Sequence, residues 1–242
     1  MIFRTSIKLT ILLLALALIF GRLGFWQLQR KAEKQAMFDQ FLNAPVMSVE
    51  EALDREQLFA KVRAAGAFDA NRHILLDNQI LDGRVGVHVL TPFRLQDGRT
   101  ILVNRGWLPL PPDRSTLPRI VTDPRQRSVE GRLNRLPSQG PRVGEADVLD
   151  TTGWPQLVTY FDLNPAEKAL GSKLEPWQIQ LDSDQDGGFA GRQWKAAVME
   201  PKVHGAYAVQ WFGLMSAAIV IWAVLGFRRP ATATGNAEGK DL

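Results

Sequence analysis

Cysteine is absent from this chain of 242 residues, and histidine occurs only three times. Without cysteine there is no disulfide framework, no thiolate metal site and no thiol nucleophile, which excludes copper or zinc delivery through thiolates. The sequence also has no Gly-rich phosphate loop, no Gly-x-Ser-x-Gly motif and no pair of histidines at metal-ligand spacing. The usual catalytic motifs are therefore missing, and we do not expect an enzyme.

A strong excess of one charge is missing as well. The net charge is only +4, and the positive residues are scattered or lie beside apolar segments. Anionic lipid headgroups account for basic residues in those places. Membrane lipid is therefore an expected partner, and nucleic acid is not.

The first apolar segment lies at the N-terminus, where Arg4 and Lys8 precede an apolar core from Leu9 to Gly21. A secretory signal begins in the same way, so the two interpretations compete. The residues after the core remain apolar and aromatic, without a small-x-small cleavage site. We therefore interpret residues 1–26 as an uncleaved transmembrane anchor.

The second apolar segment lies near the C-terminus and carries no formal charge between Lys202 and Arg228, a stretch of about 25 residues. A helix that spans a bilayer needs roughly 20 residues, so this segment is predicted to be a second transmembrane helix. Two such helices place both chain ends on one side of a membrane. The charges beside them do not decide which side, because long loops translocate regardless of charge.

The region between the anchors is large enough for one domain, and its short apolar runs predict β-strands. Asp82-Gly83 and Asp97-Gly98 separate short apolar runs, a strong hairpin signal that predicts an antiparallel meander. The expected strands are Phe59–Phe68, His73–Asn78, Val85–Phe93, Thr100–Trp107, Ser128–Leu133 and Trp177–Leu181. Short helices are expected after Ser48, as N-cap, and after Asn164, with Pro165 in the first helical position.

The predicted fold class is therefore a membrane-anchored α+β protein, in which two transmembrane helices flank a mostly antiparallel β domain with a barrel-like or sandwich-like form. The expected parts are an anchor (1–26), an amphipathic stalk helix (27–45), a β-rich extramembrane domain (46–202), a transmembrane helix (203–228) and a disordered cytoplasmic tail (229–242).

His204 stands in the first turn of the second anchor. At about 100° per residue, it shares one helix face with Tyr207, Trp211 and Met215. An ionisable group at the mouth of a membrane helix suggests function, although polar and aromatic residues there also serve as interface markers. The stripe could hold a flat apolar ligand or pack against another helix, and the sequence leaves both uses open.

A second candidate is Arg105 in Asn104-Arg105-Gly106-Trp107, at the end of an expected strand. Its guanidinium fork could bind a carboxylate, or it could hold the end of a barrel in place.

Four motifs occur in one order between the two anchors. They are Gly24-Phe25-Trp26-Gln27-Leu28-Gln29-Arg30, Leu90-Thr91-Pro92-Phe93, Val103-Asn104-Arg105-Gly106-Trp107-Leu108-Pro109 and His204-Gly205-Ala206-Tyr207-Ala208-Val209-Gln210-Trp211-Phe212. In this order and with this two-anchor layout, the chain resembles the Surfeit locus family of cytochrome c oxidase assembly factors. The resemblance covers nearly the whole chain apart from the tail.

The resemblance implies a protein of the bacterial inner membrane, with its domain in the periplasm, that holds haem A transiently and assists its insertion into the core subunit of a haem-copper oxidase. The core subunit and the enzymes of haem A synthesis are the implied partners. It implies His204 as ligand of the haem iron. The other implied cofactor-binding residues are Trp26, Gln27, Arg105, Trp107, Tyr207 and Trp211.

Physical reasoning agrees with such a role, because haem A is flat, apolar and membrane-soluble, and a neutral imidazole is a common iron ligand. Arg22, Arg30 or Arg105 could pair with a propionate. The second axial ligand stays open among water, His88 and a group from the oxidase. The alternatives are a membrane scaffold that stabilises oxidase intermediates without haem, and an unrelated anchored periplasmic binding domain.

Overall fold

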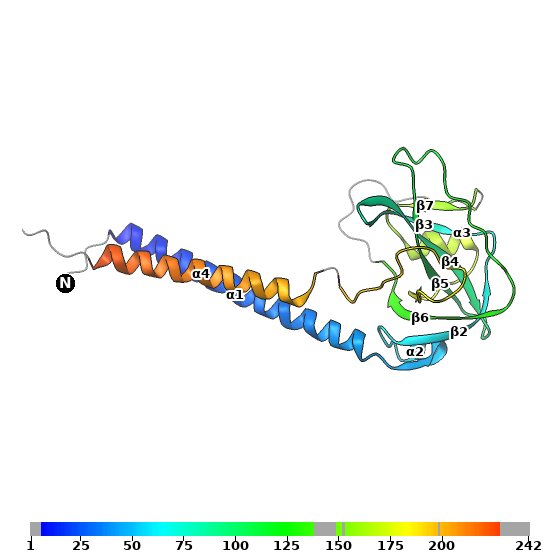
Figure 1. The fold of residues 1–242 in the computed structure, drawn as a ribbon, viewed down its shortest axis with the longest axis horizontal. Coiled ribbons are helices and arrows are strands. Elements are labelled where there is room, and N and C mark those ends of the chain that lie inside the picture. Colours follow the sequence, from blue (N-terminus) through cyan, green and yellow to red (C-terminus); the bar gives the residue numbers. More distant parts are fainter. Residues whose placement is uncertain (1–5, 138–148, 152, 198, 228–242) are drawn as a thin grey trace, which may run out of the picture. The chain divides into compact units, whose positions relative to one another are not determined.

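The computed structural model describes residues 6–137, 149–151, 153–197 and 199–227 (Figure 1). The chain forms two compact units. One consists of the residues up to Phe38 together with those from Ala197 onward, and the other runs from Asp39 to Ala196. The predicted tail over 229–242 lies outside the described residues.

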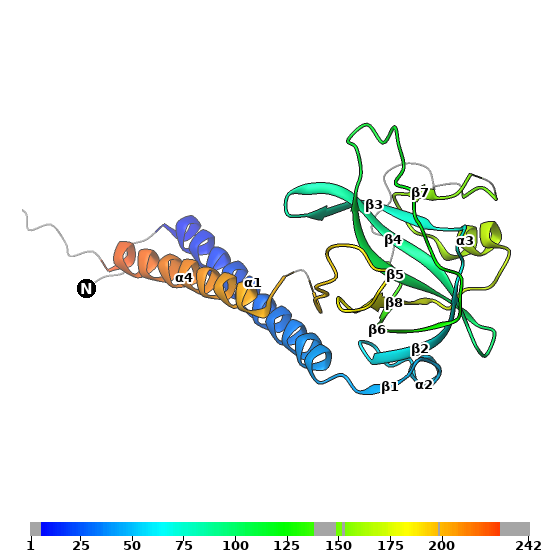
Figure 2. The same cartoon turned by 45° about the vertical axis from the view of Figure 1, so that its right-hand side comes forward.

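The first unit is built from two long helices, α1 (Ile7–Leu42) and α4 (Pro201–Gly226), which lie side by side in Figures 1 and 2. Both are long and apolar enough to cross a membrane, as the sequence predicts. Helix α1 runs without interruption from the anchor through the predicted stalk and ends just before Asn43-Ala44-Pro45. Proline occupies the first turn of α4, where its missing N–H costs nothing.

The second unit is a closed β-barrel with additional strands. Its strands are β1 (Val46–Ser48), β2 (Lys61–Phe68), β3 (Ile74–Leu81), β4 (Arg84–Leu95), β5 (Thr100–Pro109), β6 (Arg127–Arg135), β7 (Gln156–Val158) and β8 (Trp177–Leu181). Strand β2 pairs with both β6 and β4, which closes the ring β2-β6-β8-β5-β4. Only β5–β8 is a parallel pair within this ring. The fold class predicted from the sequence is therefore confirmed.

The turns and the short helix α2 form where the local sequence predicts them. Asp82 and Gly83 both have positive φ, as a tight hairpin between β3 and β4 requires, and Gly98 has φ 92° in the turn between β4 and β5. Helix α2 (Val49–Asp54) begins after Ser48, whose side chain accepts a hydrogen bond from the Glu51 N–H.

Two expectations about the domain were wrong. The meander starts at β3, because β2 pairs with β6 and β4 instead of with β3. Helix α3 (Leu163–Leu170) begins before Asn164, and Asp162 is its N-cap. The three-residue strands β1 and β7 were not expected. Each pairs in parallel with a longer strand, so their existence depends on the neighbour and not on a local pattern.

The main core fills the barrel. Alternate residues of the strands point inward, among them Val62, Phe93, Val103 and Ile179, and α2 contributes further apolar side chains. A second core, which includes Phe161, forms between β3, β4 and α3. The barrel walls are therefore rigid supports for polar residues at the ends of these strands.

Candidate functional site

His204 lies in the first turn of α4 and faces α1. Its Nδ1 lies 2.8 Å from Oε1 of Gln27, and both side chains are buried, with 9% and 8% of their surfaces exposed. Both residues are candidates from the sequence motifs, although 177 positions separate them. The structure brings them together as one pair between two helices.

The pairing favours one tautomer of a neutral imidazole. With the amide oxygen of Gln27 as acceptor, the neutral ring carries its proton on Nδ1 and donates it. The other ring nitrogen, Nε2, then keeps its lone pair. This atom is buried and has no hydrogen-bond partner among the described residues. An oriented imidazole with a free nitrogen is the arrangement that proteins use to bind metals, with the other nitrogen held by a hydrogen bond.

Small residues of α1 allow the two helices to approach each other beside this pair. A Cβ placed on Gly24 would lie 2.7 Å from the ring of Phe212, and one placed on Gly21 would lie 3.1 Å from Sδ of Met215. Close packing of this kind is the usual way for membrane helices to associate. The α4 stripe thus serves in part as a packing seam, since Trp211 also stacks on Phe20 with ring centroids 5.8 Å apart.

Trp26 and Tyr207 leave 45% and 44% of their surfaces exposed. Tyr207 lies three residues after His204 in α4, and Trp26 directly precedes Gln27 in α1. The guanidinium of Arg30 lies 5.8 Å from the Trp26 ring centroid. Exposed aromatic rings at this level of a membrane helix can contact headgroups or a flat ligand.

Arg105 and Trp107 belong to β5, in the β domain, and are buried there. The Trp107 Nε1–H donates to the carbonyl of Gln79 at 2.9 Å. Arg105 donates to the carbonyl of Gly187 at 2.6 Å and to the hydroxyl of Thr122 at 2.5 Å. No described carboxylate pairs with Arg105, so the carboxylate contact that the sequence suggested is not made within this part of the chain.

The two remaining histidines also lie in the β domain. His73 is 2% exposed, and His88 packs edge-on against Trp194. Burial lowers the pKa of each to about 4, and for His73 the positive charge of Arg105 adds to this effect. Both are therefore neutral near pH 7. Among the described residues, no three His, Cys, Asp or Glu side chains gather as a metal site.

Comparison with known proteins places this sequence in a family. The model of the SURF1 family matches residues 14–216, which is most of the chain. The chain belongs to the SURF1 family. This confirms the resemblance carried by the four ordered motifs, and the family is known for oxidase assembly.

Relatives of the SURF1 family are similar over most of this chain. A SURF1-like protein of Rickettsia felis is 28% identical, over 90% of this chain and 96% of its own. Surfeit locus protein 1 of Takifugu rubripes is 27% identical, over 87% of this chain and 93% of its own. The mouse protein of the same name is 27% identical, over 87% of this chain and 73% of its own. The similarity therefore includes both long helices and the β domain.

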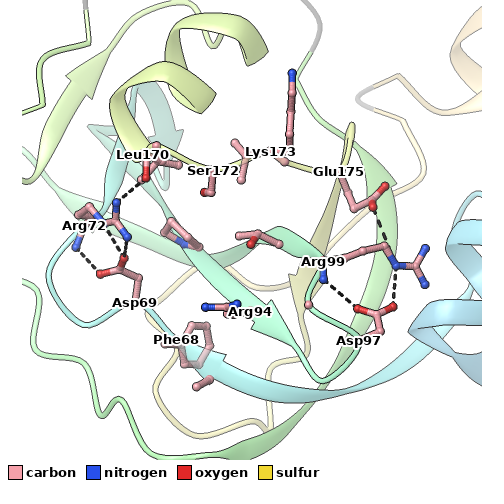
Figure 3. A pocket seen from close by; sticks show the side chains of 16 residues that line it. Phe68, Asp69, Arg72, Arg94, Asp97, Arg99, Leu170, Ser172, Lys173 and Glu175 are labelled. Carbon is pink, nitrogen blue, oxygen red and sulfur yellow. Dashed lines mark hydrogen bonds and ion pairs between the residues drawn. The ribbon is translucent and has the colours of Figure 1, made fainter.

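The β domain of this SURF1 family member has an open pocket of about 830 Å³ that was not expected from the sequence (Figure 3). Its charged lining is largely paired within the domain, since Arg72 binds Asp69 and Arg99 binds Asp97. The lining comes from the end of β2, the β4–β5 turn and the residues after α3. No local pattern links these segments, so the sequence held no signal for this pocket.

Proposed function

We propose that this protein is an assembly factor of the haem-copper oxidase that binds haem A transiently at His204 and presents it to the oxidase core subunit. The observation that carries the proposal is the buried Nε2 of His204, which has no described hydrogen-bond partner while Gln27 holds Nδ1. Family membership supports the oxidase as the target.

The donor set fits a haem that is passed on. His204 offers one ring nitrogen, and no group of three or more described His, Cys, Asp or Glu side chains forms a metal site of another kind. Imidazole is a common axial ligand of haem iron. A single protein ligand leaves the other axial position to water or to a group of the acceptor, and it gives weaker retention than two protein ligands would.

The residues around His204 have distinct roles in this proposal. Gln27 fixes the tautomer and the ring orientation. Trp26 and Tyr207 present exposed aromatic surface that can cover an apolar macrocycle. Trp211 stacks on Phe20 and so stabilises the contact between α1 and α4. Arg22 and Arg30 are the candidates for a propionate, and Arg30 would have to exchange its exposed ion pair with Glu33 for it. For Arg105 and Trp107, a role in haem binding stays a prediction, since their contacts are within the β domain.

The proposed setting is the bacterial inner membrane, crossed twice, with the β domain in the periplasm. Two apolar helices at the two ends of the described chain support this topology. Haem A, with its apolar tail, partitions into such a membrane, and the enzymes of its synthesis and the oxidase core subunit are the proposed partners.

A scaffold without haem is the second candidate, and one observation favours it. The contact of His204 with Gln27 joins α1 to α4, and hydrogen bonds between membrane helices stabilise their association by about 0.6–2 kcal/mol. His204 could therefore be a purely structural residue. If His204 is a ligand, its substitution removes bound haem A. If it is only structural, its substitution weakens the contact between α1 and α4.

The deciding experiment is the optical spectrum of detergent-purified protein from cells that synthesise haem A. Wild type should show a haem A band, and His204→Ala should lose it at unchanged yield. His204→Asn is the sharper variant, because its amide can still bond to Gln27 but binds iron poorly. Loss of haem in His204→Asn at wild-type thermal stability supports the carrier. If wild type carries no haem A, or if His204→Asn keeps it, the scaffold is the better account.

His88→Gln is the matched control, since His88 is the open candidate for a second ligand. An unchanged spectrum in this variant assigns the second position to water or the acceptor. A changed spectrum would instead place His88 on the iron.

A further inference from the structure

A second polar cluster lies inside one end of the β-barrel. Arg105 on β5 takes the next inward-facing position after Val103. Arg127 on β6 takes the inward-facing position before Val129. Phe68, the last residue of β2, lies between them, with its ring centroid 5.2 Å from the Arg105 guanidinium and 5.9 Å from that of Arg127. The apolar interior of the barrel thus ends in two cations.

Positive charge in this cluster has the carboxylate of Asp123 nearby, whose pKa the charge of Arg127 helps to lower, but no ion pair. Neither Arg105 nor Arg127 forms an ion pair with any described carboxylate. The nearby Asp123 is engaged by Arg125, and Asp186 pairs with neither cation although it precedes Gly187 in the chain. Arg105 is 3% exposed, and burial together with the charge of Arg127 lowers its pKa to about 10. Two guanidinium groups therefore lie close together without an ion pair to a described carboxylate.

Several polar atoms of the cluster lack partners. The Nε of Arg127 and the Nε2 of His73 are buried and make no hydrogen bond within the described chain. Nδ1 of His73 contacts the hydroxyl of Thr91 at 3.1 Å, and this hydroxyl also lies 3.5 Å from Nη1 of Arg105. Buried donors without acceptors are uncommon in folded proteins, because each costs about 1–3 kcal/mol.

The two guanidinium groups converge on one point of the loop after β8. A Cβ built on Gly187 would lie 3.4 Å from Nη1 of Arg127 and 3.6 Å from Nη2 of Arg105. Gly187 has φ 78°, which favours glycine, and its carbonyl accepts from Nε of Arg105. The recorded hydrogen bonds of Arg105 use Nε and Nη1, which leaves Nη2 for another acceptor.

We propose that Arg105 and Arg127 form an oxyanion site that takes a phosphate-type dianion. Guanidinium groups bind phosphate oxygens through parallel hydrogen bonds, and a dianion neutralises both cations at once. The hydroxyls of Thr91 and Thr122 supply further donors at the same end of the barrel. The dianion can be free phosphate or the phosphate group of a larger molecule. This site shares Arg105 with the residues that the resemblance implies for haem A, but Arg127 and the phosphate-type ligand are not part of the haem proposal, so the Arg127 variant tests the site separately.

The test is thermal unfolding of the full-length protein in detergent, followed by the near-UV signal of its tryptophans, in sodium phosphate and in sodium chloride of equal ionic strength. At a phosphate concentration about tenfold above Kd, the melting temperature of wild type should rise by about 3–6 °C. Arg127→Gln should lose this rise. This variant is preferred to Arg105→Gln because Arg127 is only half-buried, so the barrel is expected to fold without it.

Arg119→Gln is the matched control, since it removes one exposed cation outside the cluster and should keep the phosphate effect. Phenyl phosphate and acetate extend the test. A larger shift with phenyl phosphate than with phosphate assigns the site to a phosphate group on a larger molecule, and the reverse order assigns it to free phosphate. No shift in wild type, an equal shift in Arg127→Gln, or an equal effect of acetate would overturn the proposal.

Discussion

Gln27 provides the sharpest test of how the helix pair prepares His204. The change Gln27→Leu replaces the acceptor of the Nδ1 proton with an apolar side chain of similar size. It leaves the imidazole itself in place. The ring then loses its fixed tautomer and orientation. Loss of such an orienting partner lowers metal affinity by about 10–100-fold in known sites.

The same fold-change gives the expected free energy. A 10–100-fold loss of haem A affinity corresponds to about 1.4–2.8 kcal/mol. The 2.8 Å contact between two buried groups supports the upper part of this range, because no described side chain replaces Gln27 as acceptor. The loss of helix association should be smaller, at about 0.6–2 kcal/mol.

The assay is titration of haem A into purified protein, followed by absorbance, with wild type, Gln27→Leu, Gln27→Glu and His204→Ala. Gln27→Glu should bind at least as tightly as wild type, since a carboxylate is a stronger acceptor for the Nδ1 proton. Gln29→Leu is the control, because Gln29 is an exposed glutamine on the same helix. Equal haem affinity of Gln27→Leu and wild type, alongside complete loss in His204→Ala, would refute the orienting role of Gln27.

Three further outcomes follow from the packing and the charges. Gly24→Ala should lower the melting temperature of the helix pair in detergent, because its Cβ would lie 2.7 Å from an aromatic ring, whereas Gly213→Ala meets nothing within 4 Å and should be neutral or stabilising. Arg114→Met should lower the free energy of unfolding of the β domain by about 2–4 kcal/mol, since it leaves the buried carboxylate of Asp77 without its 2.6 Å ion pair. For His73, a folded pKa of about 4 against 6.5 unfolded means that the unfolded chain binds more protons below pH 6.5. Stability should therefore fall between pH 6.5 and 4, by up to about 3 kcal/mol for this group.

Each of these outcomes has a matched control. For Arg114 it is Arg125→Met, which breaks an exposed ion pair and should cost less than about 1 kcal/mol in urea unfolding. For His73 it is His73→Gln, compared with wild type in urea at pH 7 and pH 4.5, where the variant should show the weaker pH dependence. Equal slopes in the two proteins would contradict the assignment, as would a stable Arg114→Met or equal melting of the two glycine variants.

Much of the candidate site followed from the sequence because its signals are local. His204 stands out as an ionisable residue at the start of an apolar run, and the motif order led to Gln27 and Trp26. The contact between His204 and Gln27 was not predictable, since it depends on how α1 and α4 rotate against each other. The placement of Arg105 was also open. A strand pattern shows that its side chain alternates with the core residues, but not that Arg127 approaches it.

The amino-acid sequence by itself determined the two apolar helices, the strands with their Asp-Gly turns and the family, because each of these depends on the order of neighbouring residues. Only the tertiary structure decided that β2 closes the barrel against β4 and β6, that His204 meets Gln27, and that two arginines share one end of the barrel. These features arise from pairings between segments far apart in the chain. Their free energy comes from packing and from the burial of polar groups, which a local pattern does not encode.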